Sequence, residues 1–129
     1  VFPSGIIGPG DLQGGSFTSM AKSFLSGKLP FAVRGGYDFV DVRDVANGIL
    51  ACSESGEPGK GYILSGCYVT IRRMLQLERK PLFFTPYSVS VLASNGQFSH
   101  AAASERFAYQ PRPIEETLGD MTAWLLNQK

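Results

Sequence analysis

Residues 36–48 have the sequence Gly36-Tyr37-Asp38-Phe39-Val40-Asp41-Val42-Arg43-Asp44-Val45-Ala46-Asn47-Gly48. The first half is rich in aromatic and β-branched residues, which predicts a strand over Tyr37–Val42. Asp41 is then placed to cap a helix, and Asp44 follows three residues later, at the position of a capping-box acid. The helix is expected to bury an apolar face made of Val45, Ala46, Ile49 and Leu50. A strand that runs directly into a helix indicates an α/β chain.

Short apolar runs on both sides of this joint predict further strands. Phe2–Ile7 is closed by Gly8-Pro9-Gly10-Asp11, and Tyr62–Leu64 ends at Ser65-Gly66. Continuous apolar runs of this kind are typical of interior strands of a parallel sheet. Phe31–Val33 is strand-like as well, and the Arg34-Gly35-Gly36 segment after it suits a tight hairpin or a bulge.

Helical spacing and capping residues predict four more helices. They are Ser16–Leu25, a helix from Thr70 to about Glu78 capped by Thr70, Ser99–Phe107 capped by Ser99, and a last helix opened by Pro113. The last helix has two glutamates in its first turn and an apolar stripe of Ile114, Leu118, Met121, Trp124 and Leu125. From Lys80 to Asn95 the pattern is irregular and assigns no element. The order of elements indicates one α/β unit without an internal repeat.

The bulk composition excludes several classes of protein. The 129 residues are 43% hydrophobic, which is enough for a modest core, and the net charge of +1 comes without blocks of either sign. Neither a nucleic acid nor a membrane is therefore expected as a partner. The start Val1-Phe2-Pro3 has neither the pattern of a signal peptide nor an initiator methionine, which indicates a fragment or a processed chain.

The two cysteines and the single histidine offer no framework for a metal site. Cys52 and Cys67 lack CxxC spacing, so we expect small buried thiols in a reducing, cytoplasmic setting. His100 has no companions for metal binding or for a Ser/His/Asp triad. We expect it at the surface or at the start of a helix.

Three segments in order carry a resemblance to a known family. They are Phe2-Pro3-Ser4-Gly5-Ile6-Ile7-Gly8-Pro9-Gly10-Asp11, the stretch from Gly36 to Gly48, and Tyr109-Gln110-Pro111-Arg112-Pro113-Ile114-Glu115-Glu116-Thr117-Leu118. Together they resemble the second half of the NAD-dependent epimerase/dehydratase family, the extended short-chain dehydrogenases, and in particular its dihydroflavonol-reductase-like branch. The resemblance implies strands of an incomplete Rossmann-type parallel sheet plus a small mixed substrate-binding region, with helices packed on both.

The resemblance also implies roles for three residues. In the family, the strand that corresponds to Phe2–Gly8 has its Pro-Ser end against the nicotinamide and phosphates, so Pro3 and Ser4 are implied cofactor contacts. The alternative is that they only shape a buried strand end. Arg34 corresponds to the region where relatives bind a substrate phosphate through an arginine; the alternative is an exposed hairpin arginine. Asp41 and Asp44 resemble a pair of catalytic acids, but capping explains their spacing.

The residues that the family needs for catalysis are missing. None of the five tyrosines is followed four residues later by a lysine, which would lower its pKa for acid–base work. The glycine-rich dinucleotide fingerprint is absent too, because Gly5-Ile6-Ile7-Gly8-Pro9-Gly10 has the wrong spacing. We therefore expect residues 1–129 to be the carboxyl-terminal, substrate-side part of such an enzyme, without the dinucleotide-binding half and with neither catalytic nor metal-binding residues. NAD or NADP is expected in the intact parent and not tightly on this chain alone.

Two departures from the family pattern are visible. The helical stretch between Leu77 and Pro81 is shorter than in relatives, through a deletion or missing residues. Ala108 stands where relatives have the glycine of a left-handed helix cap. Alanine there would cost about 1 kcal/mol or would end the helix differently.

Three hypotheses for function remain open. The chain is an inert portion of an enzyme that reduces, epimerises or dehydrates a small carbonyl or sugar-like substrate, a non-catalytic binding or oligomerisation module derived from that family, or a truncation with no separate role. Strands taken from the middle of a sheet present unpaired edges. We therefore expect the isolated chain to self-associate or to be only marginally stable.

Overall fold

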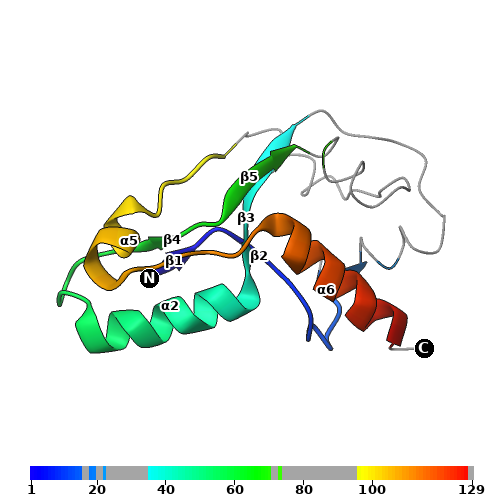
Figure 1. The fold of residues 1–129 in the computed structure, drawn as a ribbon, viewed down its shortest axis with the longest axis horizontal. Helices are drawn as coiled ribbons and strands as arrows, with labels where there is room; N and C mark the ends of the chain where they lie inside the picture. Colours follow the sequence, from blue (N-terminus) through cyan, green and yellow to red (C-terminus); the bar gives the residue numbers. More distant parts are fainter. Residues whose placement is uncertain (16–17, 20–21, 23–34, 71–72, 74–95, 128–129) are drawn as a thin grey trace.

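The computed structural model describes residues 1–15, 18–19, 22, 35–70, 73 and 96–127 (Figure 1). The elements in these residues are β1 (Phe2–Pro3), β2 (Gly5–Ile7), β3 (Gly36–Asp41), α2 (Val42–Ser55), β4 (Ile63–Leu64), β5 (Cys67–Thr70), α5 (Ala101–Phe107) and α6 (Ile114–Asn127). The predicted strand at Phe31–Val33 and the irregular segment Lys80–Asn95 lie outside the described residues. So do most of the helices expected at Ser16–Leu25 and after Thr70, although the Thr70 hydroxyl accepts a hydrogen bond from the Arg73 N–H, as a cap does.

The strands form two small sheets with different topologies. β1 and β4 pair in parallel, with Phe2 opposite Ile63 and Pro3 opposite Leu64. In the second sheet the order is β2-β3-β5, with β2 parallel and β5 antiparallel to β3. The expected fold class, parallel strands plus a small mixed region with helices packed on them, is confirmed. The run predicted as one strand over Phe2–Ile7 is divided between the two sheets, because Ser4 lies between β1 and β2.

The buried residues form two core clusters, one beside α6 and one beside α2 and α5. α6 lies along the mixed sheet, where the buried side chains are Ile7, Phe39, Val69, Ile114 and Leu118. α2 and α5 pack with the β1–β4 pair around Val40, Val45, Tyr62, Leu64, Ala103 and Tyr109. The two helix-covered cores lie side by side along the molecule in Figure 1. Tyr109, in the segment between α5 and α6, joins the second core to the chain that enters α6.

The strand-to-helix joint at Asp41 forms as predicted, but the helix turns a different face inward. The Asp41 carboxylate accepts a hydrogen bond from the Arg43 N–H at the start of α2, which confirms the cap. Val45 is buried, as expected, and Gly48 lies against Leu64. The prediction for the other three apolar residues was wrong: Ala46, Ile49 and Leu50 face outward. The close contact at Gly48 selects the buried face, because a side chain there would collide with Leu64.

The last two helices begin and end close to their predicted residues. The N-cap residue of α5 is His100, one residue after the predicted cap Ser99. The hydroxyl of Ser99 still accepts a hydrogen bond from the Ala101 N–H. α5 ends at Ala108, which adopts the left-handed conformation with φ 53° and ψ 35°. Pro113 precedes α6, and the carbonyl of Pro113 accepts hydrogen bonds from the N–H groups of Glu116 and Thr117 in the first turn. The stripe of α6 is buried as expected, except that Trp124 is half-buried.

The cysteines are less buried than the sequence indicated. Both thiols are free; Cys52 is half-buried beside the second core, and Cys67 is exposed at the start of β5. The prediction of two buried cysteines is therefore wrong for Cys67, which is exposed at the first position of β5 although it lies on the same face of that strand as the buried Val69. None of the helices in the described part of the chain is long and apolar enough to cross a membrane.

Candidate functional site

The two sheets separate at a point that we call the sheet junction, formed by Ser4, Gly5, Asp38, Ser65 and Gly66. β1 ends at Pro3 and β4 ends at Leu64, and these residues are opposite each other. The two parallel strands therefore present their carboxyl ends together, and each is followed by a Ser-Gly pair. In open α/β sheets the crevice beyond the carboxyl ends of parallel strands is where ligands bind.

The hydroxyl of Ser4 has no hydrogen-bond partner among the described residues although its oxygen is buried. The backbone of Ser4 is already used, since its N–H donates to the Leu64 carbonyl at 3.1 Å. A hydroxyl can donate one hydrogen bond and accept two, and a buried polar group without a partner is costly. Ser4 is therefore the residue of the junction with unused capacity to bind a polar group.

Pro3, the other expected cofactor contact, lies on the open side of β1. The N–H groups of Phe2 and Ser4 both point to β4, where they donate to Tyr62 and Leu64. Pro3, between them, thus faces the other edge of β1, which pairs with no strand among the described residues, so its missing N–H leaves no gap in the ladder. Pro3 is exposed. It can offer a ligand a rigid apolar contact but no hydrogen-bond donor.

Ser65 is a junction residue that the sequence analysis did not select. It is fully buried, and its hydroxyl lies 3.2 Å from Nδ1 of His100 and 3.3 Å from the Phe98 carbonyl oxygen. The repeated pattern of a short apolar run followed by Ser-Gly, at Ser4 and again at Ser65, was the signal that could have indicated it. Because Ser65 already has partners, it orders the segment before α5, whereas the hydroxyl of Ser4 keeps its hydrogen-bonding capacity unused.

Two close contacts hold the junction together. The Gly66 N–H donates to the carboxylate of Asp38 at 3.1 Å, and Asp38 is only 2% exposed. A Cβ atom at Gly66 would overlap the Phe39 carbonyl oxygen, so only glycine allows β4 and β3 to approach so closely here. A Cβ atom at Gly5 would lie 3.0 Å from the Asp38 carbonyl oxygen, which is also tight. The junction is therefore positioned by rigid strands.

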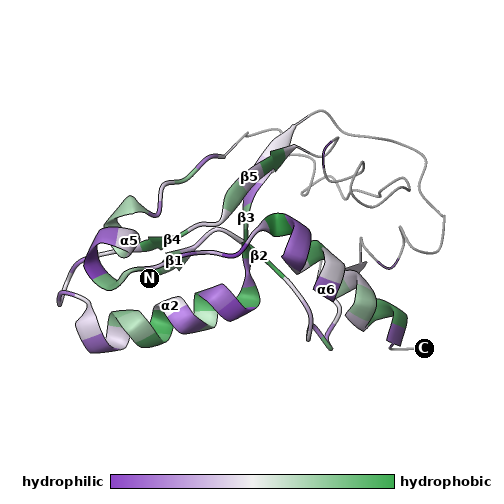
Figure 2. Ribbon diagram, viewed as in Figure 1, coloured by the Kyte–Doolittle hydropathy of each residue, from purple (hydrophilic) through white to green (hydrophobic). Residues whose placement is uncertain are grey.

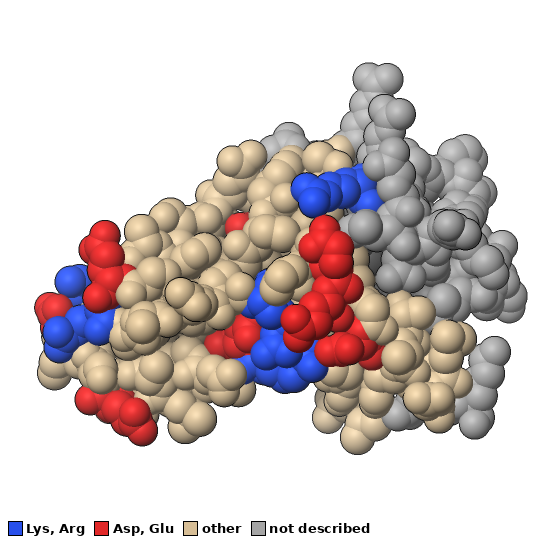
Figure 3. All heavy atoms as spheres, viewed as in Figure 1, with Lys and Arg blue, Asp and Glu red and all other residues tan. Residues whose placement is uncertain are grey.

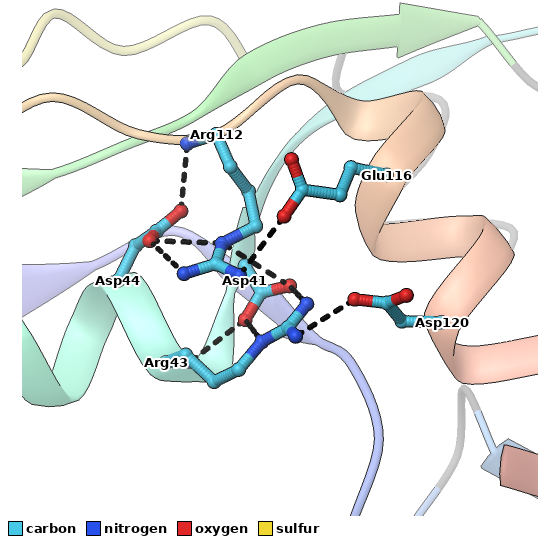
Figure 4. A network of polar contacts seen from close by, with 6 residues as sticks. All are labelled: Asp41, Arg43, Asp44, Arg112, Glu116 and Asp120. Carbon is cyan, nitrogen blue, oxygen red and sulfur yellow. Dashed lines mark hydrogen bonds and ion pairs between the residues drawn. The ribbon is translucent and has the colours of Figure 1, made fainter.

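A network of charged residues fixes the helices beside the junction (Figure 4). Arg112 donates to Asp44 from its backbone N–H at 2.8 Å, from Nε at 3.0 Å and from Nη2 at 2.9 Å. Its Nη1 reaches Glu116 at 3.2 Å. The carboxylate of Asp44, expected at the capping-box position, thus binds the segment that leads into α6. These contacts join the first turn of α2 to the start of α6.

Asp41 and Arg43 form the second half of this network. Arg43 donates to both carboxylate oxygens of Asp41, at 2.9 and 2.7 Å, and its Nη1 reaches Asp120 of α6 at 2.7 Å. Burial by itself would raise the pKa of Asp41, but the hydrogen bonds from Arg43 and Thr117 and the charge of Arg112 outweigh it and lower that pKa. Asp41 and Asp44 are therefore structural groups that bind arginines: Asp41 caps α2 as predicted, and the carboxylate of Asp44 binds Arg112.

The junction presents groups suited to contact with a polar ligand. It offers a hydroxyl, a proline face and rigid backbone. No group of three or more metal-binding side chains occurs in the residues that the structure describes. Arg34, the expected substrate contact, lies outside those residues.

Comparisons with known proteins agree with this fold. No protein-family model matches the sequence. Sterol demethylase protein B of Methylococcus capsulatus is 33% identical over 76 residues, which are 59% of this chain and 23% of that protein.

Solved structures match almost the whole chain. The structure of gox2253 has a sequence 25% identical to this chain and a TM-score of 0.78. The match includes 98% of this chain and 48% of the gox2253 chain. RMD from Pseudomonas aeruginosa, complexed with NADPH, is 20% identical with a TM-score of 0.73, and 47% of it is covered. UDP-glucose 4-epimerase from Thermotoga maritima, with UDP-glucose, is 17% identical with a TM-score of 0.78, and 45% of it is covered.

The chain therefore has the fold of Rossmann-type, NAD-dependent sugar epimerases and dehydratases, and the resemblance to the NAD-dependent epimerase/dehydratase family is confirmed at the level of the fold. It spans less than half the length of these solved structures and about a quarter of the curated relative.

Proposed function

We propose that this chain is the substrate-side, carboxyl-terminal part of an NAD(P)-dependent oxidoreductase, epimerase or dehydratase, and that it is catalytically incomplete alone. The observation that carries the proposal is the buried, unpartnered hydroxyl of Ser4 beside the carboxyl ends of two parallel strands. In the intact parent, Ser4 and Pro3 contact the cofactor, NAD or NADP. The dinucleotide-binding half and the Tyr-x-x-x-Lys pair belong to the part of the parent that this chain does not contain.

The uncovered face of the first sheet supports this proposal. Leu64 points to α2, so the neighbouring Ile63 points to the opposite face, and Phe2 lies opposite Ile63 in the ladder. Phe2 is 64% exposed and Ile63 is 37% exposed. Parallel sheets are nearly always covered by helices on both faces. In the parent, we expect the dinucleotide-binding half to cover this apolar face.

The substrate in this proposal is a small carbonyl or sugar-like molecule. One observation on a similar structure supports it: the Thermotoga maritima structure contains UDP-glucose. The NADPH in the Pseudomonas aeruginosa structure supports the proposed cofactor. Arg34 is the proposed contact to a substrate phosphate. The reducing, cytoplasmic location remains part of the proposal and is supported by the two free cysteines.

Cofactor binding by the parent enzyme tests the role of Ser4. The parent is expressed from the reading frame extended upstream of Val1, and NADH and NADPH are titrated by fluorescence. Ser4→Ala should weaken binding of the preferred cofactor about threefold to tenfold, because one hydrogen bond is lost. Ser55→Ala, at the exposed end of α2, is the matched control and should bind normally. Equal cofactor affinity in Ser4→Ala and the parent would contradict the assignment.

Assays on the purified 129-residue chain test its incompleteness. We expect neither saturable NAD(P)H binding in the millimolar range nor reduction of carbonyl substrates. Measurable carbonyl reduction by this chain alone would show that the proposal is wrong. An upstream reading frame without a glycine-rich fingerprint and a Tyr-x-x-x-Lys pair would instead favour the second candidate.

The second candidate is a non-catalytic binding or oligomerisation module descended from the same family. The observation that favours it is the amount of apolar surface exposed in the isolated chain, including Phe2, Ile6, Ile49 and Leu50. In both candidates we expect the isolated chain to self-associate, because this surface loses its contact with water when copies meet.

A further inference from the structure

Two aromatic side chains stand beside the sheet junction and keep part of their surface open to solvent. The rings of Tyr37, on β3, and Phe98, in the segment before α5, meet edge to face with their centroids 5.8 Å apart. Tyr37 is half-buried, and Phe98 is 42% exposed. A second edge-to-face contact, at 5.9 Å, joins Tyr37 to Phe39 in the core beside α6. We call Tyr37 and Phe98 the aromatic pair; it is anchored in a core and still has exposed ring surface.

Two contacts connect the aromatic pair to the sheet junction. A Cβ atom at Gly5, the residue after Ser4, would lie 3.1 Å from Cδ1 of Tyr37, so this ring lies against the backbone next to Ser4. The carbonyl oxygen of Phe98 lies 3.3 Å from the hydroxyl of Ser65, the residue after β4. Because β1 and β4 both end at the junction, the aromatic pair lies at the carboxyl ends of these two parallel strands.

The surroundings of the aromatic pair are apolar and carry little charge. Tyr37 is opposite the buried Val69 in the ladder between β3 and β5, and Figure 2 shows hydrophobic residues in β5. Figure 3 shows almost no charged side chain over the segment that leads into α5, which is yellow in Figure 1.

The described arginines do not supply a phosphate site beside this surface. An arginine suits a phosphate through its planar fork of donors. Every arginine in the described part of the chain is already paired with a carboxylate, and these arginines are Arg43, Arg73, Arg106 and Arg112. The described surface at the junction is therefore suited to a neutral, partly apolar ligand.

We propose that Tyr37 and Phe98 determine substrate specificity in the parent, by binding the apolar ring of a neutral carbonyl compound. This inference rests on the proposed function, in which Ser4 contacts the nicotinamide cofactor, and it narrows the substrate class. A substrate carbon that reacts with the cofactor must come within about 3–3.5 Å of it. The rest of the substrate then lies against the side chains that adjoin Ser4, and flat aromatic rings favour contact with another ring.

The location of the aromatic pair favours a substrate over the dinucleotide-binding half as its partner. The apolar face assigned to that half is formed by Phe2 and Ile63, on a face of the first sheet. The aromatic pair lies instead beyond the carboxyl ends of the strands, where ligands bind in open α/β sheets. Backbone also holds the two rings in place: a Cβ atom at Gly96 would lie 2.9 Å from Tyr37 and 3.3 Å from Phe98. A rigid support of this kind is what a specificity surface requires.

Ligand binding by the intact parent tests the inference. The probe is α-tetralone, a neutral ketone of two fused rings, titrated calorimetrically into the parent saturated with the oxidised cofactor so that the ketone is not reduced. Tyr37→Leu and Phe98→Ala should each raise the Kd of α-tetralone about fivefold or more, because a ring contact is lost. Tyr37→Phe keeps the ring and should bind normally. Cofactor affinity should be unchanged in all three variants.

Phe107→Ala is the matched control. Phe107 makes the same kind of edge-to-face contact, with Tyr62 at 5.2 Å, but next to the start of β4 and away from the junction. Its alanine variant should bind α-tetralone normally. Phe98 is exposed enough that Phe98→Ala should fold, and circular dichroism verifies the folding of every variant.

Each outcome bears on the inference. Weaker α-tetralone binding confined to Tyr37→Leu and Phe98→Ala supports the specificity role. An unchanged Kd in both variants, or an equal loss in Phe107→Ala, would overturn it. A parent that binds cofactor and UDP-glucose but not α-tetralone would also overturn it, and would favour the phosphate contact proposed for Arg34. A parent that binds neither NADH nor NADPH would overturn the proposed function as well, so the two failures are distinguishable.

Discussion

Arg112 binds the carboxylate of Asp44 through three N–H groups, one from its backbone and two from its guanidinium, at 2.8 to 3.0 Å. The side chain of Arg112 is 20% exposed and that of Asp44 is 7% exposed, so the pair is largely shielded from water. The contact connects residues 68 positions apart in the chain. It attaches the segment before α6 to the start of α2, and with it Tyr109 of the second core.

Removing this pair should destabilise the protein strongly. Arg112→Met leaves the Asp44 carboxylate largely buried with only the backbone N–H as donor, and should cost roughly 2–4 kcal/mol in the free energy of unfolding. Arg73→Met is the matched control, because the Arg73–Glu115 pair is exposed and should contribute less than about 1 kcal/mol. Urea unfolding measures both. Similar losses in the two variants would show that Arg112 is no more than a surface ion pair.

Protonation of Asp41 in acid should lower the free energy of unfolding. The pKa of Asp41 is lower in the folded chain than its ordinary value of 3.8, so the ionised form is favoured by folding. This contribution to stability is complete above the ordinary pKa and is lost as the pH falls through the lower, folded pKa. In Asp41→Asn, urea midpoints followed downward from neutral pH should start lower and fall less steeply in acid. Parallel acid profiles for the two proteins would contradict this account.

Ala108→Gly should stabilise the protein by about 0.5–1 kcal/mol. Ala108 has the left-handed conformation that glycine adopts without strain, and it is exposed, so no packing is lost. Ala102→Gly, inside α5, should instead cost up to about 1 kcal/mol, because glycine is a poor helix former. Thermal unfolding shows whether each variant gains or loses stability. A loss of stability in both variants would mean that the left-handed conformation of Ala108 carries no strain.

Two glycine-to-alanine changes should act in opposite directions. Gly66→Ala would push a methyl group into the Phe39 carbonyl at the sheet junction and should cost on the order of 2 kcal/mol or more. Gly119→Ala, in the middle of α6 with open space around it, should stabilise by about 0.5–1 kcal/mol. Chemical denaturation gives both values. A tolerated Gly66→Ala would show that β3 and β4 can separate at the junction.

The local features of the fold could be predicted from the sequence because they depend on neighbouring residues. The cap at Asp41, the start of α6 after Pro113 and the alanine in a glycine position at residue 108 all follow from short-range geometry. The continuous apolar runs in the sequence were sufficient to predict the parallel strands. The motifs around Ser4 and Gly36–Gly48 also led to the family, which the solved structures confirm at the level of the fold.

Only the tertiary structure decided which groups meet. Nothing local distinguishes Val45 from Ile49, but packing against Leu64 needs the face with Gly48, and so Ile49 and Leu50 are outside. The same holds for Asp44, whose partner is 68 residues away, and for the two Ser-Gly pairs, which become one junction through the pairing of β1 with β4. Sequence patterns encode the propensity of a segment to form an element and to bury a face. Which face is buried, and which polar group keeps an unused hydrogen bond, depends on contacts between segments far apart in the chain.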